Sequence, residues 1–342
     1  MTIKVFSDRI ELGNKIIAAT PTGIRIDDAL AANTQQQGYV KQANFTARGL
    51  AYGNFVFQGS VAGFVAGGYV GPSTNVIDKF PFAVNANAID VGDLTQARQH
   101  TTGQSSSVNG YTSGGFVVNT IDKFAFSNNA NATDVGDLTQ ARGSGSGQSS
   151  SVSGYTSGGY SPSIVNTVDK FLFATDGNAT DVGDLTQARR FSAGQSSTTF
   201  GYVSGGESPF VNTIDRFPFA ADTNATDVGD LTQVRTAVTG QSSSSSGYSS
   251  GGISSSPPNV YSNTIDKFPF ATNTNASDVG DLTQARGYVC GQSSTVSGYT
   301  SGGQTPPGYV NTIDKFPFAT DTNASDVGDI SVTRATSSGT QF

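Results

Sequence analysis

The sequence predicts an all-β protein in which a six-bladed β-propeller follows a small N-terminal β module. The first observation is a repeated tetrapeptide of the type Ile-Asp-Lys-Phe, which begins at Ile77, Ile121, Val168, Ile214, Ile265 and Ile313. Its copies are 44 to 51 residues apart, a period typical of propeller blades or helical arrays. The second observation is that Gly, Ser, Thr and Asn dominate the repeat without an apolar 3.6-residue period, which excludes helices. A β-solenoid or an open array of the same units is the alternative, although a solenoid coil normally contains fewer residues.

Residues 1–47 lie outside the repeat and predict the N-terminal module. "IKVFSDRIELGNKIIAATPTGIRIDDAL" indicates two or three strands with turns at Gly13-Asn14 and at Pro21-Thr22-Gly23, and residues 31–47 resemble a polar linker. Residues 1–13 contain no apolar run of signal-peptide length. Fewer than fifty residues rarely form a stable core alone, so we expect this module to anchor the chain to another protein or to its own copies. Residues 48–342 then form the propeller.

Each repeat contains four segments with strand character. In order they are of the types "GQSSSVS", "GYTSGG", "NTIDKFPF" and "DVGDLTQAR", separated by Gly pairs and Asn-rich turns. The third segment alternates with a period of two, which places its two phenylalanines on one side. We expect these phenylalanine pairs to pack between blades. The small first segment suits the narrow centre of a propeller, and the double glycine suits positive φ angles and close backbone approach.

The order of these residues resembles the kelch repeat, in which an Arg, an aromatic residue, a double glycine and a further aromatic strand precede the next Arg. Here the order runs Arg142, Tyr155, Gly158-Gly159, Phe171 and Arg189, and it holds in six units from about Arg48 to Arg334. The chain lacks the tryptophan that kelch units carry before the next Arg. The resemblance implies a propeller that binds a partner, without implying any particular activity.

The two ends of the repeat region predict how the ring closes. The Arg-x4-Gly signature occurs seven times, from Arg48 to Arg334, whereas the double glycine occurs six times. One first strand is therefore in excess, and the C-terminal "ATSSGTQF" is expected to pair with the first blade and remove an exposed edge. The alternative is that residues 49–57 fill this position.

Composition argues against several classes of function. The net charge is -7, which disfavours nucleic acid as a partner because phosphate binding needs clustered basic residues. Cys290 is the one cysteine and His100 the one histidine, so no His or Cys zinc cluster and no Ser–His–acid triad repeats. We expect Cys290 to be a small buried side chain and His100 a loop residue.

The repeat Arg and the tetrapeptide Lys are expected to be solvated and to pair with nearby Asp residues. No phosphate-binding loop or dinucleotide fingerprint occurs, so no catalytic residue and no organic cofactor is predicted.

The Asn-rich turns are candidate calcium loops. "DTNATDVGD" places oxygen ligands at alternate positions, which suits calcium. The candidate ligands are Asp222, Asn224, Asp227 and Asp230, and in the last blade Asp321, Asn323, Asp326 and Asp329. In the other interpretation, Asn224 and Asp227 cap turns through their own backbone and Asp230 pairs with a repeat Arg.

The segments that follow each double glycine differ from blade to blade. They contain the candidate recognition residues Tyr69, Phe116, Tyr160, Phe210, Tyr261 and Tyr309. Variable loops on a rigid frame are where recognition usually occurs, although such loops also tolerate drift without function.

The overall style resembles virion proteins of tailed bacteriophages, particularly marine ones. The residues that carry the resemblance are the opening "IKVFSDRIELGN" and the Gly/Ser/Thr/Asn-rich repeats behind it. It implies a non-enzymatic tail fibre, or a capsid fibre or decoration protein, made in the host cytoplasm and located in the virion. Expected partners are other virion proteins, further copies of the chain, and a glycan or protein of the host surface, without membrane insertion. A cellular kelch-like binding module and, less favoured, a propeller-type glycan hydrolase are the alternatives.

Overall fold

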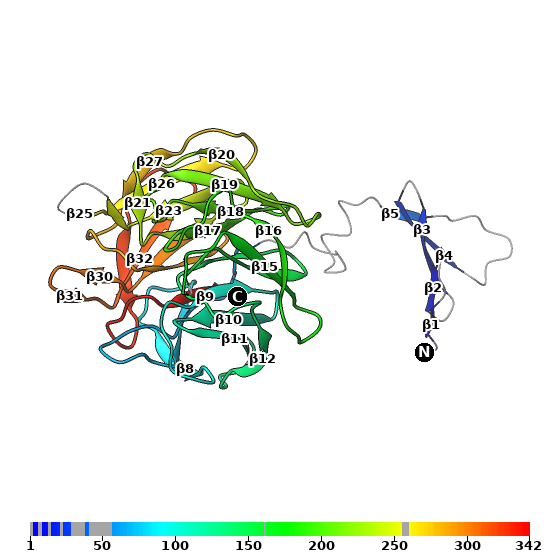
Figure 1. Ribbon diagram of the computed structural model, residues 1–342. Helices are drawn as coiled ribbons and strands as arrows, with labels where there is room; N and C mark the ends of the chain where they lie inside the picture. The colour runs from blue at the N-terminus through cyan, green and yellow to red at the C-terminus, as the bar shows by residue number, and fades with distance from the viewer. Residues whose placement is uncertain are drawn as a thin grey trace. The chain divides into compact units, whose positions relative to one another are not determined.

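The computed structural model describes residues 57–160, 162–254 and 260–342 in full, and describes five strands within residues 3–40 by their backbone (Figure 1). The chain divides into two compact units, residues 1–55 and 56–342. The predicted domain boundary between residues 47 and 48 falls within residues 41–56, which lie outside the described residues. The described residues contain strands and no helix, and hence no helix capable of crossing a membrane.

The first unit is an antiparallel sheet in which neighbouring strands follow one another in sequence. Its strands are β1 (Ile3–Val5), β2 (Arg9–Leu12), β3 (Lys15–Thr20), β4 (Gly23–Asp28) and β5 (Gly38–Val40). The expectation of two or three strands followed by a polar linker was wrong, because β5 lies inside that linker and pairs with β4, Ile24 opposite Val40. Backbone pairing of so short a strand leaves no periodic signal in the sequence. Of the predicted turn residues, Gly23 begins β4, and the others lie outside the described residues.

The second unit contains six four-stranded antiparallel sheets in its described residues. Blade 1 consists of β34 (Ser338–Gln341), β6 (Ala62–Ala66), β7 (Val76–Pro81) and β8 (Ile89–Asp93). Blade 2 consists of β9 (Thr102–Ser105), β10 (Asn109–Gly115), β11 (Val118–Ala125) and β12 (Thr133–Asp137). Blade 3 consists of β13 (Ser146–Ser149), β14 (Ser153–Ser157), β15 (Thr167–Leu172) and β16 (Thr180–Asp184).

The second half of the ring repeats this arrangement. Blade 4 consists of β17 (Ala193–Ser196), β18 (Phe200–Ser204), β19 (Thr213–Pro218) and β20 (Thr226–Asp230). Blade 5 consists of β22 (Thr239–Ser242), β23 (Ser246–Ser250), β26 (Thr264–Pro269) and β27 (Ser277–Asp281). Blade 6 consists of β28 (Cys290–Ser293), β29 (Ser297–Ser301), β32 (Thr312–Pro317) and β33 (Ser325–Asp329). The short strands β21 (Arg235–Thr236), β24 (Ile253–Ser254), β25 (Val260–Tyr261), β30 (Gln304–Thr305) and β31 (Gly308–Tyr309) lie in the connections.

The innermost strands form a closed ring. They contact one another in the cyclic order β9, β13, β17, β22, β28, β34 and back to β9. Six four-stranded sheets around one axis make this unit a six-bladed β-propeller, and the predicted fold class is confirmed.

The C-terminus closes the ring. β34 pairs with β6, with Ser338 opposite Ala66 and Gln341 opposite Gly63, and the C-terminus lies beside β9 and β10 in Figure 1. The predicted pairing of the C-terminal segment with the first blade is thus confirmed. Residues 57–59 take a different place: Gln58 Nε2 donates to Ser242 O (2.8 Å), and Gly59 N donates to Ser293 O (2.8 Å). They bond to the ends of inner strands in blades 5 and 6, rather than occupying the position of β34.

Glycines allow the inner strands to approach the axis. A Cβ on Gly194 would collide with the carbonyl oxygen of Gly147 in the preceding blade. The same relationship connects all six members of the set Gly103, Gly147, Gly194, Gly240, Gly291 and Gly339 in a circle. The "GQSSSVS"-type segment was predicted to lie at the narrow centre of the propeller, and this prediction is confirmed. Neighbouring inner strands approach so closely there that only a residue without a side chain fits between them.

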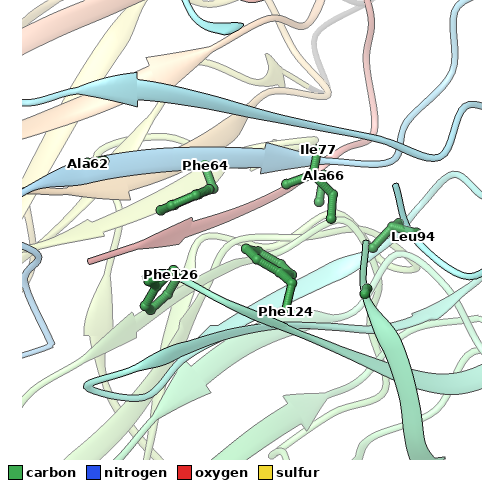
Figure 2. Close-up of a cluster of buried hydrophobic side chains, with 8 residues drawn as sticks. Ala62, Phe64, Ala66, Ile77, Leu94, Phe124 and Phe126 are labelled. Carbon is green, nitrogen blue, oxygen red and sulfur yellow. The ribbon is translucent and has the colours of Figure 1, made fainter. Parts of the chain in front are cut away.

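Aromatic side chains fill the spaces between blades. Phe219 stacks on Tyr155 of the preceding blade, with ring centroids 5.0 Å apart, and Phe217 lies 5.4 Å from the same ring. In blade 1 a phenylalanine replaces the tyrosine: Phe64 lies against Phe124 and Phe126 of blade 2 (Figure 2). The predicted packing of the phenylalanine pairs between blades is confirmed, and each pair contributes edge and face contacts in addition to apolar burial.

A buried arginine joins the strands of every blade. Arg334 Nη2, from the last repeat, lies 3.0 Å from Asp78 Oδ2 in β7 of blade 1, and both side chains are 0% exposed. The equivalent pairs are Arg98–Asp122, Arg142–Asp169, Arg189–Asp215, Arg235–Asp266 and Arg286–Asp314. The expectations of solvated arginines, and of a pair between Asp230 and a repeat Arg, were therefore wrong. A buried guanidinium requires an ionised partner beside it, and the tetrapeptide Asp occupies that position.

Candidate functional site

The blade segments that vary in sequence gather at one end of the ring. Each described segment after a double glycine pairs with the residues that follow a repeat Arg, as in the bridges Tyr69–Ala335, Gly143–Tyr160 and Arg190–Glu207. We call this end the mouth face. At the opposite end lie the turns between the first two strands of each blade, together with Gly59 and Phe342. Gly59 and Phe342 therefore lie at the end of the propeller away from the variable segments.

Six residues form a ring of backbone hydrogen bonds at the mouth face. This mouth ring consists of His100, Ser144, Phe191, Ala237, Tyr288 and Thr336, each two positions after a repeat Arg. The amide of each donates to the carbonyl of the preceding member at 2.8–2.9 Å, and the circle closes with His100 N donating to Thr336 O. All six have positive φ angles, between 55° and 62°. Such backbone is costly for residues other than glycine, and the closed circuit holds it in place.

Large and small side chains alternate around the mouth ring. His100, Phe191 and Tyr288 alternate with Ser144, Ala237 and Thr336. The Phe191 ring meets the His100 ring at 5.3 Å and the Tyr288 ring at 5.2 Å, both edge to face. Three aromatic rings thus occupy alternate places where six would crowd one another near the axis, and their mutual contacts hold them rigid.

A cavity of about 110 Å³ extends along the axis below these rings. Its walls are the mouth ring, the six inner-strand glycines from Gly103 to Gly339 that approach the axis, and the small residues between these two sets. Phe57 also lines the cavity. Cys290 is part of this wall and is 4% exposed, and burial raises the pKa of its thiol to about 11. The predicted role of Cys290 as a small buried side chain is confirmed. The cavity has room for a few water molecules rather than for a sugar or a nucleotide.

An ion pair lies beside the aromatic rings on the mouth face. Arg190 Nε and Nη2 both approach Glu207 Oε1 at 2.9 Å. The Arg190 guanidinium also lies over the Tyr160 ring at 5.0 Å and the Phe191 ring at 5.2 Å. The four side chains are half-buried, so the planar charged groups are held by packing while part of each remains accessible.

Tyrosines extend this aromatic surface on the same face. Tyr69 and Tyr309 meet edge to face at 5.7 Å. Burial raises the pKa of Tyr261, and the neighbouring Tyr309 adds to the rise. Burial also raises the pKa of Tyr288, with smaller contributions from Glu207 and Tyr261.

His100 is uncharged at neutral pH. Burial, and to a smaller degree the charge of Arg190, lowers its pKa to about 4. Its Nδ1 atom is buried and has no hydrogen-bond partner among the described residues. The expectation that His100 is a loop residue is confirmed, since it lies between β8 and β9, and its neutral ring contributes an aromatic surface to the mouth.

The predicted recognition residues all lie on the mouth face. Phe116 and Phe210 are the most exposed, at 52% and 37%, while Tyr69, Tyr160, Tyr261 and Tyr309 are half-buried. Sequence reasoning did not identify Phe191, Tyr288, Arg190 or Glu207 as members of this surface. Alignment of the repeats on the Arg would have revealed Phe191 and Tyr288, because each lies two residues after the Arg of its repeat.

The candidate calcium loops lie on the outer side of the blades, away from the mouth face. Asp227 Oδ1 accepts from Gly229 N (3.1 Å), whereas Asn224 Oδ1 accepts from Asp184 N of the preceding blade (3.1 Å). Asp222 Oδ1 pairs with Lys170 Nζ at 2.9 Å. In the last blade Asp326, Asn323 and Asp321 make the equivalent contacts, to Gly328, Asp281 and Lys267.

These contacts support the turn-capping interpretation of the loops for one residue and not for another. Turn capping is confirmed for Asp227 and wrong for Asn224, which joins two blades instead. Asp230 and Asp329 each donate their backbone amide to the Asn of the following blade, Asn275 and Asn87. Among the described residues no three Asp, Glu, His or Cys side chains converge as a metal site would require.

Comparison with known proteins supports the fold and gives no information on function. No family model matches the chain, and no curated protein matches it. Among solved structures, "Structure of YjhT" is similar, with a TM-score of 0.60 and 11% sequence identity. The similarity covers 72% of this chain and 88% of that one. At this identity the likeness concerns the propeller architecture and carries no activity, substrate or partner to this chain.

Proposed function

We propose that the chain is a non-enzymatic structural protein of a tailed-phage virion, whose propeller binds a ligand on the host surface through the mouth face. The observation that carries the proposal is the concentration of partly exposed aromatic side chains on that face, on an otherwise repetitive frame. Phe116, Tyr160, Phe191, Tyr288 and Tyr309 all belong to this surface. Aromatic residues supply large contact areas at low entropic cost, as binding surfaces require.

The distribution of acidic residues supports a binding role over hydrolysis. The segments after the double glycines and the residues flanking the mouth ring contain one acidic residue, Glu207. It is paired with Arg190. Hydrolysis of a glycosidic bond ordinarily requires two carboxyl groups on either side of that bond. Within residues 57–342, the Asp residues belong to the buried Arg pairs or to the strands and turns of the outer side.

The two units have separate roles in this proposal. Residues 1–47 attach the chain to other virion proteins or to its own copies, and the propeller displays its mouth face. A truncated chain that starts at Ala47 is expected to fold, to remain monomeric in light scattering, and to fail to attach to particles.

Two measurements test the proposal. Mass spectrometry of gradient-purified particles, from cultures that express the gene, should detect the chain as a virion component. Fluorescently labelled full-length chain should bind intact cells of the strains that these particles infect, and not cells of resistant strains. Absence of the chain from the particles would refute the virion role, and equal binding to both kinds of cell would refute the attachment role.

A further inference from the structure

We propose that the ligand of the mouth face is a neutral glycan, bound by Tyr160, Arg190, Phe191, Glu207 and Tyr288. This inference rests on the proposed host-binding function and specifies its chemistry and its residues. Tyr160 and Glu207 come from two variable segments, and Arg190, Phe191 and Tyr288 follow repeat arginines. The site therefore combines residues from blades 3, 4 and 6 or from the connections that lead into them.

The aromatic part of the site suits the apolar face of a sugar ring. Pyranose rings present C–H groups on one face, and these pack well on flat aromatic surfaces. Tyr160, Phe191 and Tyr288 are half-buried, so each ring is supported from behind and partly open to solvent. The edge-to-face contact between Phe191 and Tyr288 fixes the angle between their rings. Little ordering remains to be done upon binding.

The polar part suits sugar hydroxyl groups. Arg190 contacts one oxygen of Glu207, Oε1, through both Nε and Nη2. The guanidinium has further N–H donors and the carboxylate has a second oxygen. A fixed planar donor next to a fixed planar acceptor matches a pair of adjacent hydroxyl groups, each of which donates and accepts.

The balance of charge favours a neutral sugar over an acidic one. The charges of Arg190 and Glu207 offset each other at 2.9 Å. The neighbouring His100 is neutral because burial lowers its pKa to about 4. The chain as a whole carries a net charge of -7, so a sialic or uronic acid would be repelled rather than attracted.

The mouth ring itself indicates which substitutions should leave the fold intact. Ala237 occupies the position equivalent to Phe191 and Tyr288, and its positive φ of 55° matches theirs of 55° and 56°. Alanine is thus compatible with this backbone, and Phe191→Ala and Tyr288→Ala are expected to fold. Arg190→Gln and Glu207→Gln test the polar pair. Val108→Ser, at a 60% exposed position on the opposite face, is the matched control.

The experiment is a microarray of neutral, sialylated and uronic-acid glycans probed with the full-length chain, followed by calorimetric titration of the glycans that bind. We expect binding to neutral glycans, with affinity at least about tenfold weaker in Phe191→Ala, Tyr288→Ala, Arg190→Gln and Glu207→Gln. Val108→Ser should bind as the unchanged chain does. Binding confined to acidic glycans, or unaffected by the four mouth variants, would overturn the proposal.

Treatment of host cells separates this proposal from the broader one. Periodate oxidises adjacent hydroxyl groups of sugars to aldehydes by breaking the carbon–carbon bond between them, so treatment of the cells should abolish binding of the labelled chain. If binding survives periodate and is lost after protease treatment, the ligand is a protein: the glycan proposal fails while the host-binding function stands. If the chain binds neither cells nor any glycan of the array, both proposals fail.

Discussion

Arg235 Nη2 lies 2.7 Å from Asp266 Oδ2, and both side chains are 0% exposed. Arg235 also donates to Gly251 O (2.7 Å) and Thr264 O (2.9 Å), and Asp266 accepts from Thr232 Oγ1 (2.6 Å). Burial lowers the pKa of Arg235, while the charge of Asp266 opposes that shift. The pair thus ties the connection between two blades to strand β26 of the second.

Replacing Asp266 with Asn should destabilise the propeller by about 3–5 kcal/mol, because it leaves a buried guanidinium without an ionic partner. The free energy of unfolding in urea measures the effect. Lys170→Ala, which removes the exposed pair with Asp222, is the control and should cost at most about 1 kcal/mol. Equal losses in the two variants would contradict the assigned role of the buried pair.

Gly194→Ala should destabilise the ring by about 1–3 kcal/mol, since the added methyl group would meet the carbonyl oxygen of Gly147. Gly177→Ala is the matched control, because a Cβ at Gly177 has nothing within 4 Å. That variant should stay within about 0.5 kcal/mol of the unchanged protein. Thermal and urea unfolding compare the two. A tolerated alanine at Gly194 would show that the inner strands have room to separate.

Removal of residues 335–342 should sharply lower the melting temperature and cause self-association. The deletion removes β34 and exposes the edge of β6, which is then free to pair with another chain. Calorimetry and light scattering measure the two effects. Gln341→Ala keeps β34 and loses the hydrogen bond from Gln341 Nε2 to Phe57 O (2.9 Å), so its effect should be small. An unchanged melting temperature after the deletion would show that the ring does not depend on β34.

Acidification from pH 7 to pH 5 should cost the protein about 2 kcal/mol through His100. Its pKa is lowered to about 4 in the folded chain, and an unfolded histidine titrates near 6.5. The unfolded state therefore takes up the proton first, so this contribution is complete above about pH 6.5 and is lost as the pH falls toward 4.

His100→Asn isolates that effect, because asparagine tolerates the positive φ of 58° and does not titrate. The difference in unfolding free energy between pH 7 and pH 5 should be smaller in this variant. His100 is the one histidine of the chain, which keeps the comparison simple. Equal pH dependence in both proteins would show that His100 is accessible to protons in the folded state.

Excess EDTA should leave the melting temperature unchanged. The loop oxygens of Asp222, Asn224 and Asp227 accept hydrogen bonds from Lys170, Asp184 and Gly229, and so are engaged without calcium. A fall of many degrees, restored by added calcium, would instead show that these loops bind the ion, because a ligand specific to the folded state stabilises it by mass action.

The sequence by itself determined the number of blades, the order of their strands and the side on which the phenylalanines lie. These properties follow from the repeat period and from a period-two pattern within single strands, and both can be observed along the chain. The excess first strand also predicted that the C-terminus completes blade 1. The short strand β5 escaped prediction, because three residues are too few to show a period in the sequence.

Only the tertiary structure decided which partners meet across blades. Asn224 was expected to cap its own turn, yet it bonds to Asp184, which is 40 residues earlier. Arg235 was expected in solvent, yet closure of the ring encloses it and leaves Asp266 as its partner. The mouth ring likewise brings Phe191 and Tyr288 together although another member, Ala237, lies between them. A repeat pattern specifies local conformation, whereas burial and contact between blades depend on how all six curve around the axis.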